Sequence, residues 1–227
     1  MKIYQKFFAV FLLLLVLPLQ GCATAYSAKE IEAWVIDAET KQPLEGVNVV
    51  AHWVLSFGME GGQQTDLMLM ESVTDKDGRF YFPAWGPVSI PASLPWEARM
   101  KNQDPAIIIF KPGYQWVGLS NEITGPYPDA GPAMRTSRWN GKIIAMKKFE
   151  GSLDRYGSMV DGVLTGVSYG QCRWKNIPRI LVALDKESGQ LRKRKVFTGL
   201  PTISKIEDIS VGKGCGSVKE FFKDYLK

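Results

Sequence analysis

The chain has 227 residues, of which 45% are hydrophobic and 22% are charged, and its formal net charge at pH 7 is +5. This length is enough for one large domain or for a domain with a smaller appendage. The charge is too mild to indicate a nucleic-acid partner, so we expect a solvated surface of mixed charge.

Residues 1–21 have the pattern of an export signal. Lys2 and Lys6 form a short basic region, and the apolar run 7–17 that follows is shorter than the roughly 20 residues that span a bilayer. The alternative, a membrane anchor followed by a chance cysteine, requires a longer run. Removal of this segment takes away two lysines and no acid, which lowers the net charge to +3.

The tetrapeptide Leu19-Gln20-Gly21-Cys22 closes this segment and resembles the lipobox of bacterial lipoproteins. The resemblance implies that Cys22 is the mature N-terminus and carries acyl chains such as palmitate, which hold the protein at a membrane. In Gram-negative members an aspartate after the cysteine favours the inner membrane. Here that residue is Ala23, so the resemblance implies the outer membrane, with a Gram-positive origin left open.

Two further cysteines, Cys172 and Cys215, remain after Cys22 is used. In an oxidising envelope such a pair most simply forms a disulfide. The competing interpretation is a metal site, but His52 is the only histidine and the chain has no Cys-x-x-Cys pair. We therefore expect a disulfide and no metal or other cofactor.

Extended structure is predicted after a short tether at residues 22–29. Period-two alternation marks 31–37 and, more clearly, 47–53, where one set of positions is apolar and the other contains Asn48 and His52. The second of these segments is predicted to be a strand with one apolar face. The apolar set is Val47, Val49, Ala51 and Trp53.

A second extended pair, 67–74 and 79–82, flanks the sequence Asp75-Lys76-Asp77-Gly78. Asp-Gly between extended segments predicts a hairpin, since glycine adopts positive φ without penalty. The two aspartates, with Asp66 and Glu71 nearby, also suggest a calcium site. Their spacing lacks the other acids of an EF-hand loop, so we prefer the turn.

Three motifs occur in order along this part of the chain. They are Pro43-Leu44-Glu45-Gly46-Val47 after an extended segment, Thr74-Asp75-Lys76-Asp77-Gly78-Arg79-Phe80, and Lys111-Pro112-Gly113-Tyr114 after an apolar strand. In this order they resemble the carboxypeptidase regulatory-like domains, which have a transthyretin-like β-sandwich fold. Together they cover roughly residues 30–148. The resemblance implies a sandwich without chemistry, because the chain has no zinc-peptidase ligand set to which an activity could be assigned.

The region 149–227 is predicted to be a small helical appendage, which makes the expected fold class mainly β with a transthyretin-like or Ig-like sandwich. Ser152 is placed to cap a first helix, a second begins near Pro178 and ends before Gly189, and a third covers 217–226. The basic run 192–195 is expected to be a solvated face, with contact to anionic lipid phosphates as the alternative.

Two features could suggest a hydrolase. Gly166-Val167-Ser168-Tyr169-Gly170 matches the nucleophile-elbow pattern, but a helical pattern precedes it and His52 lies upstream rather than downstream. His52 itself is the natural acid–base candidate. We expect it on the polar face of its strand, as a surface residue.

Four tryptophans fall in loop-rich insertions at 83–105 and 115–141. Flat aromatic rings in loops can stack on sugars or hold a partner protein, and equally they can pack beneath the loops as part of the core. These residues are Trp85, Trp96, Trp116 and Trp139.

The sequence therefore favours a non-enzymatic envelope lipoprotein that binds a protein or glycan partner or has a structural role. It would be attached to the membrane through Cys22 and would have no nucleic-acid partner. The alternative is a hydrolase that acts on cell-envelope material.

Overall fold

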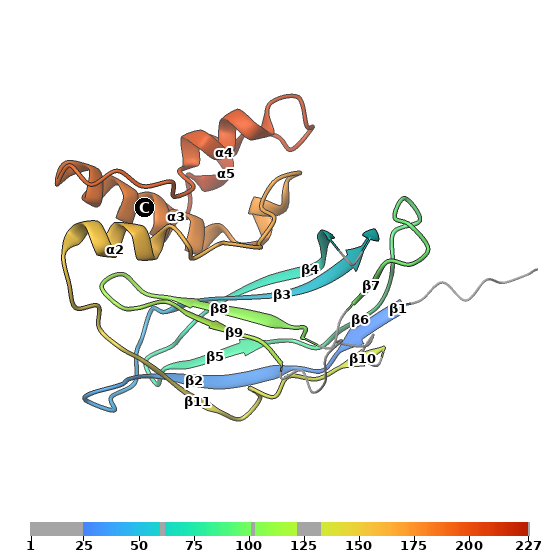
Figure 1. Cartoon of the computed structure of the whole chain (residues 1–227), viewed down its shortest axis with the longest axis horizontal. Helices are drawn as coiled ribbons and strands as arrows, with labels where there is room; N and C mark the ends of the chain where they lie inside the picture. Colours follow the sequence, from blue (N-terminus) through green and yellow to red (C-terminus); the bar gives the residue numbers. More distant parts are fainter. Residues whose placement is uncertain (1–24, 60–61, 101–102, 122–132, 227) are drawn as a thin grey trace, which may run out of the picture.

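The computed structural model of the chain describes residues 25–59, 62–100, 103–121 and 133–226. The predicted signal segment, Cys22 and Ala23 lie outside the described residues. Within them, the chain is mainly β, and the helices gather on one side (Figure 1). No helix in this part is long and apolar enough to cross a membrane.

The strands form three sheets. In the first, β1 (Ala25–Ala28) lies between β10 (Met134–Arg135) and β6 (Trp85–Ser89), and in the second, β2 (Ile31–Asp37) lies between β11 (Ile143–Met146) and β5 (Arg79–Phe82). The third runs β4 (Gln63–Val73), β3 (Asn48–Phe57), β8 (Ala106–Phe110) and β9 (Val117–Leu119), with β7 (Arg99–Met100) paired to the end of β3. Pairing is antiparallel except for β1 with β10 and β2 with β11.

The helical layer covers the outer face of the third sheet (Figure 1). It consists of α2 (Leu153–Val160), the short 3-10 helix η2 (Arg173–Asn176), α3 (Pro178–Lys193), α4 (Ile203–Ser210) and α5 (Val218–Phe222). The molecule therefore has three layers, which are a β-sandwich of two sheet layers and a helical layer stacked on one of them.

The inner core lies between the two sheet layers. Alternate residues of β2 and β3 point into it, including Val35, Val49 and Trp53, and all three are fully buried. Phe80 and Phe82 of β5 meet edge to face at 5.7 Å in the same core. The period-two pattern of the sequence thus defines this core, and the predicted β-sandwich with a small helical part is confirmed.

The outer core lies between the third sheet and the helical layer. Val50, Leu69 and Ile108 face the helices, and Val160 and Ile180 of the helices pack in the same buried cluster. As a result β3 is buried on both faces. The prediction of a strand with one apolar face is correct for the inner core but misses the second buried face, because a helical layer covers it.

Several boundaries differ from the predictions. Residues 25–28, expected to be part of a tether, form β1 because Ala25 and Ala28 pair with β6. The turn 75–78 forms, but β4 and β5 belong to different sheets and are not a hairpin pair. Helix α3 continues through Gly189 to Lys193, and α4 lies in a segment for which no helix was predicted.

The predicted cap of the first helix is confirmed. Ser152 accepts a hydrogen bond from Arg155 N–H, and Ser217, for which no cap was predicted, accepts one from Glu220 N–H at the start of α5. Each hydroxyl satisfies an otherwise unpaired backbone donor. The first helix ends at Val160, and the following segment, which contains Gly162 and Gly166, forms turns. Glycine has low helix propensity, which explains why the helix does not continue through Gly162 and Gly166.

Candidate functional site

A buried polar cluster joins the third sheet to the helical region. His52 lies on β3 and Asp66 on the neighbouring β4, and a β-bulge shifts the register between Trp53 and Val54 so that Asp66 lies opposite Val54. Residues directly opposite each other point to the same face, and so do residues two apart on one strand. The bulge therefore turns the Asp66 carboxylate to the face that also carries the His52 imidazole.

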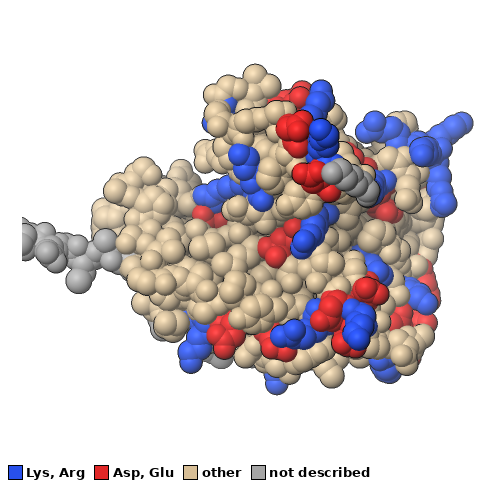
Figure 2. Space-filling view, turned by 180° about the vertical axis from the view of Figure 1, so that it is seen from behind, with Lys and Arg blue, Asp and Glu red and all other residues tan. Residues whose placement is uncertain are grey.

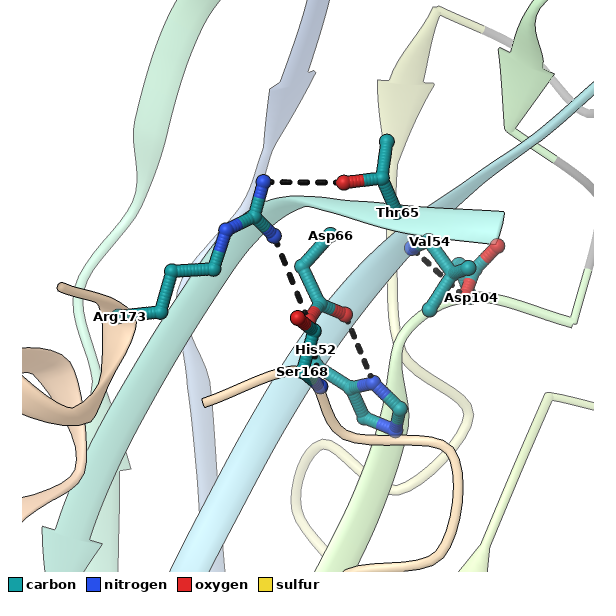
Figure 3. Close-up of polar contacts among 7 residues, drawn as sticks. All are labelled: His52, Val54, Thr65, Asp66, Asp104, Ser168 and Arg173. Carbon is teal, nitrogen blue, oxygen red and sulfur yellow. Dashed lines mark hydrogen bonds and ion pairs between the residues drawn. The ribbon is translucent and has the colours of Figure 1, made fainter. Parts of the chain in front are cut away.

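Both oxygens of Asp66 are occupied (Figure 3). Its Oδ1 lies 3.1 Å from His52 Nδ1, and its Oδ2 accepts the Ser168 N–H at 3.2 Å and lies 3.5 Å from Arg173 Nη1. Only 2% of the Asp66 side chain and 8% of the His52 side chain are exposed. A buried carboxylate is tolerated when partners of this kind replace water.

The cluster is extended by two further contacts. Arg173 donates through Nη2 to the Thr65 hydroxyl at 3.0 Å, which ties the guanidinium to β4 a second time. Asp104 accepts the Val54 N–H at 3.2 Å on the other side of β3. Burial raises the pKa of Asp104 to about 6, an effect that its backbone hydrogen bond and the nearby Arg135 only partly offset.

A cavity of about 270 Å³ opens beside His52. Its wall combines apolar side chains with three polar ones, a composition typical of small binding sites. The lining includes His52, Ile108, Trp116, Ser120, Val163 and Thr165.

Trp116 is fixed rigidly in this wall. Its indole N–H donates to the Met159 carbonyl at 2.8 Å, and the ring fits against Gly118 and Gly162. A Cβ at Gly118 would come within 3.0 Å of the ring, so the absence of a side chain there is what lets the indole lie against β9. Trp116 is half-buried and joins β9 to the helical layer.

The other three tryptophans have different environments. Trp85 is in strand β6 rather than in an insertion, is 9% exposed, and meets Trp53 edge to face at 5.3 Å, so its predicted role in partner binding is wrong. Trp139 is half-buried and donates to the Ser120 carbonyl at 3.1 Å. Trp96 alone is open, at 96% exposure. The four rings therefore do not form one binding surface.

The structure also corrects the predicted position of His52. It is buried, not on a solvated face, because the helical region covers the side of β3 that the sequence marks as polar. Ser168 of the Gly-x-Ser-x-Gly segment comes close to it (Figure 3). Ser168 joins the cluster through its backbone N–H, and the segment lies in a turn without the preceding strand that a nucleophile elbow requires.

The predicted disulfide between Cys172 and Cys215 is confirmed, with Cα atoms 5.2 Å apart. It joins the residue before η2 to the segment before α5 and closes a loop with a sequence separation of 43. Cys172 is next in sequence to Arg173, so the bond also fixes the element that carries this member of the polar cluster.

A second polar link lies at the start of α3. Glu71 of β4 accepts the Arg179 N–H at 2.9 Å and the Ile180 N–H at 2.6 Å, and thereby caps the helix from the sheet. Burial raises the pKa of Glu71 to about 7 although both hydrogen bonds favour its charged form.

The predicted turn chemistry of Asp75 is confirmed. Its Oδ1 accepts the Asp77 N–H at 3.0 Å and the Arg79 N–H at 2.9 Å, and Gly78 has a φ of +72°. These contacts account for the first aspartate without a metal. Over the described ranges, no group of three or more His, Cys, Asp or Glu side chains could hold a metal ion.

Neither the family models nor the curated proteins contain a match to this sequence. Similar solved structures include 3-chlorocatechol 1,2-dioxygenase from Rhodococcus opacus 1CP, at 16% identity and a TM-score of 0.33 over 58% of this chain and 64% of that one. Catechol 1,2-dioxygenase from Pseudomonas arvilla C-1 is 12% identical with a TM-score of 0.33, over 58% of this chain and 55% of that one. The major pilin SpaD from Corynebacterium diphtheriae is 13% identical with a TM-score of 0.29, over 53% of this chain and 30% of that one. The chain thus covers less than two thirds of each, and similarities this weak carry no argument about function.

Proposed function

We propose that this protein is a non-enzymatic lipoprotein of the cell envelope, anchored through acyl chains on Cys22 in the outer membrane, which acts as a binding module for a protein or glycan partner. The observation that carries the proposal is the lipobox-like sequence ending at Cys22, three residues before β1 begins at Ala25. The Cys172–Cys215 disulfide supports an oxidising compartment.

The cavity beside His52 is the proposed binding site. Its rigid indole offers a flat apolar surface, and the Ser120 and Thr165 side chains and His52 offer hydrogen-bonding groups at the same wall. Such a combination suits a sugar ring or an aromatic side chain of a partner, which present one flat face and a polar edge. Of the four tryptophans predicted to bind a partner, Trp116 is the one that lines this cavity.

Localisation tests the anchor. Wild-type protein is expected in the outer-membrane fraction, Cys22→Ser as an unprocessed or mislocalised precursor, and Ala23→Asp at the inner membrane. Fractionation followed by immunoblotting measures all three. Identical outer-membrane distribution of wild type and Cys22→Ser would remove the lipoprotein assignment.

Cavity filling tests the binding site. Thr165 is exposed at the cavity wall, so Thr165→Trp should block the site without disturbing the core, whereas Thr40→Trp on the turn after β2 is a matched control. We expect weaker capture of cross-linked envelope proteins or of isolated peptidoglycan by Thr165→Trp alone. Equal capture by both variants would exclude this cavity as the site.

A hydrolase is the second candidate, because one observation favours it. Ser168, His52 and Asp66 meet in space, and the His52–Asp66 contact is of the kind that orients the imidazole in serine hydrolases. A fluorophosphonate probe distinguishes the two proposals. Labelling of wild type that is lost in Ser168→Ala would support a hydrolase, and equal or no labelling of both would support the binding module.

A further inference from the structure

Three segments far apart in the sequence meet at one end of the sandwich. Ala25 at the start of β1 pairs with Ser89 at the end of β6, and Ser56 near the end of β3 pairs with Arg99 at the start of β7. The Tyr26 hydroxyl accepts the Met100 N–H at 3.1 Å and ties the first pair to the second. The start of β1, the β6–β7 connection and the last residues of β3 therefore share this end (Figure 1).

This end is poor in charge, and we call it the charge-poor end, defined by residues 25–27, 56–59 and 86–96. The sequence has no charged residue from 80 to 96, from 23 to 28, or, with neutral His52, from 46 to 59. Glu60, the acid that follows, lies outside the described residues. Figure 2 shows the same contrast, because Lys, Arg, Asp and Glu gather away from the left-hand end, where β1 begins.

Two large apolar side chains project from the charge-poor end. Trp96 is 96% exposed and Met59 is 93% exposed, which makes them the most open of the large hydrophobic residues in the described part of the chain. Partly exposed Ile90 and Leu94 lie on the same connection as Trp96. Tryptophan is the residue that bilayer interfaces favour, because its ring is apolar and its N–H can remain in the polar layer.

The position of the anchor identifies what this end faces. Two residues separate Cys22 from Ala25, and the three Cα-to-Cα steps between them reach about 10 Å when the chain is extended. The polar layer on each side of a bilayer is about 5 to 8 Å thick. The opposite end of the ten-residue strand β3 is about 30 Å farther away. An acylated Cys22 can therefore only bring the charge-poor end to the membrane.

We infer that the charge-poor end rests on the phospholipid bilayer that holds the acyl chains, with Trp96 and Met59 inserted in its polar layer. This inference depends on the proposed acylation of Cys22 and adds a defined orientation to it. Arg99 is exposed and pairs with Ser56 at the rim of the same end, where its guanidinium is placed to contact lipid phosphates. The sandwich then stands with the Asn48 end of β3 pointing away from the membrane.

Quenching of tryptophan fluorescence tests the orientation. The acylated full-length protein is reconstituted in phosphatidylethanolamine and phosphatidylglycerol vesicles, with or without bromine on the acyl chains. We expect the brominated lipid to quench part of the wild-type emission, and Trp96→Phe to lose most of that quenched part. Met59→Trp in the Trp96→Phe background should restore it, because position 59 inserts beside position 96.

A matched control places a tryptophan at the opposite end of the sandwich, far from the proposed membrane contact. Phe197 is 80% exposed and follows Val196, which packs against Gly157 of α2. Arg194 of the same segment lines a cavity with Pro112 and Gly113, just beyond the residue that pairs with Asn48 at the start of β3. Phe197→Trp in the Trp96→Phe background should stay unquenched.

Equal quenching of wild type and Trp96→Phe, or quenching restored by Phe197→Trp, would overturn the inference. Fatty-acid labelling and vesicle flotation of the same samples separate the two proposals. Labelled protein that floats without quenching at position 96 contradicts the orientation alone. Protein that carries no label contradicts the lipoprotein assignment, and the orientation falls with it.

Discussion

The inner and outer cores of this protein meet at the same strand but are held together differently. The inner core, between the sheet layers, is built almost entirely from alternating apolar side chains such as Val35, Val49 and Phe80. The outer core has apolar packing too, but two polar links connect its sheet to its helices, namely the Asp66 cluster and the Glu71 cap of α3. The disulfide beside η2 adds a covalent link within the helical layer.

The links in the outer core show how short helices can be held on a sheet. Helices α2, α4 and α5 have at most eight residues each, and isolated helices of that length are marginal in water. Their positions therefore depend on contacts with the sheet and with each other. The polar links also fix register, since each needs one particular partner, whereas apolar contacts tolerate sliding.

The inner core should be the most sensitive to truncation. Trp53 is fully buried and packs against Trp85, so Trp53→Ala should lower the free energy of unfolding by about 3 to 5 kcal/mol. Chemical denaturation measures the loss. Trp96→Ala is the matched control and should change the stability by less than about 0.5 kcal/mol, because its ring is exposed. Similar losses for the two variants would contradict this description of the core.

Removal of the disulfide should loosen the outer core selectively. Replacing Cys172 and Cys215 by serine should cost about 2 to 4 kcal/mol, since the bond closes a long loop. Hydrogen exchange should show lost protection in η2, α4 and α5 while β2 and β5 retain theirs. Uniform loss over all layers would mean that the two cores unfold as one unit.

The buried carboxylate should matter more than an exposed one. Asp66→Asn removes the charged acceptor of His52 and Arg173 and should lower the free energy of unfolding by about 1 to 3 kcal/mol. Glu32→Gln breaks the exposed pair with Arg79 and should lower the stability less than Asp66→Asn does, because solvent screens an exposed ion pair. Thermal melting of both variants checks the order, and an equal effect would show that the cluster does not fasten the helical region.

The last expected effect is a pH dependence of the link to α3. The folded protein raises the pKa of Glu71 from 4.5 to about 7, so between these values the folded state binds more protons than the unfolded state. Its stability should therefore fall as pH rises from about 4.5 to 7, by up to about 3 kcal/mol from this group, since one pKa unit corresponds to about 1.4 kcal/mol. Asp104, with a pKa raised to about 6, acts in the same direction.

Glu71→Gln removes this titration and should flatten part of the slope, whereas the exposed control Glu45→Gln should leave it unchanged. Urea denaturation at a series of pH values measures the slopes. A stability that rises over this interval in wild type would show that the two backbone hydrogen bonds to Glu71 outweigh its burial.

The sequence predicts the inner core better than the outer one for a physical reason. Alternation in β3 and the cap Ser152 are local signals, and β3 and α2 form where these signals predict them. The burial of His52 depends on a layer more than 100 residues later in the chain. The side chain of its partner Asp66 reaches the same face only because of the β-bulge, and the alternation of apolar and polar residues does not predict that bulge.

Long-range contacts also determine the environments of the tryptophans. Their position in Pro-rich segments predicts loops. Trp85 instead belongs to strand β6, where it pairs with Ala28 of β1. The indole N–H of Trp116 donates a hydrogen bond to the Met159 carbonyl. Both contacts join distant parts of the chain. The Cys172–Cys215 pair could be predicted because elimination left one partner for each thiol.

The most direct measurement is the mass of the N-terminal peptide of protein isolated from the envelope. Trypsin cleaves after Lys29, so the lipoprotein assignment predicts a peptide that begins at Cys22, ends at Lys29 and carries the added mass of acyl chains. An unmodified Cys22 in a peptide that continues back through Gly21, Gln20 and Leu19 would contradict it.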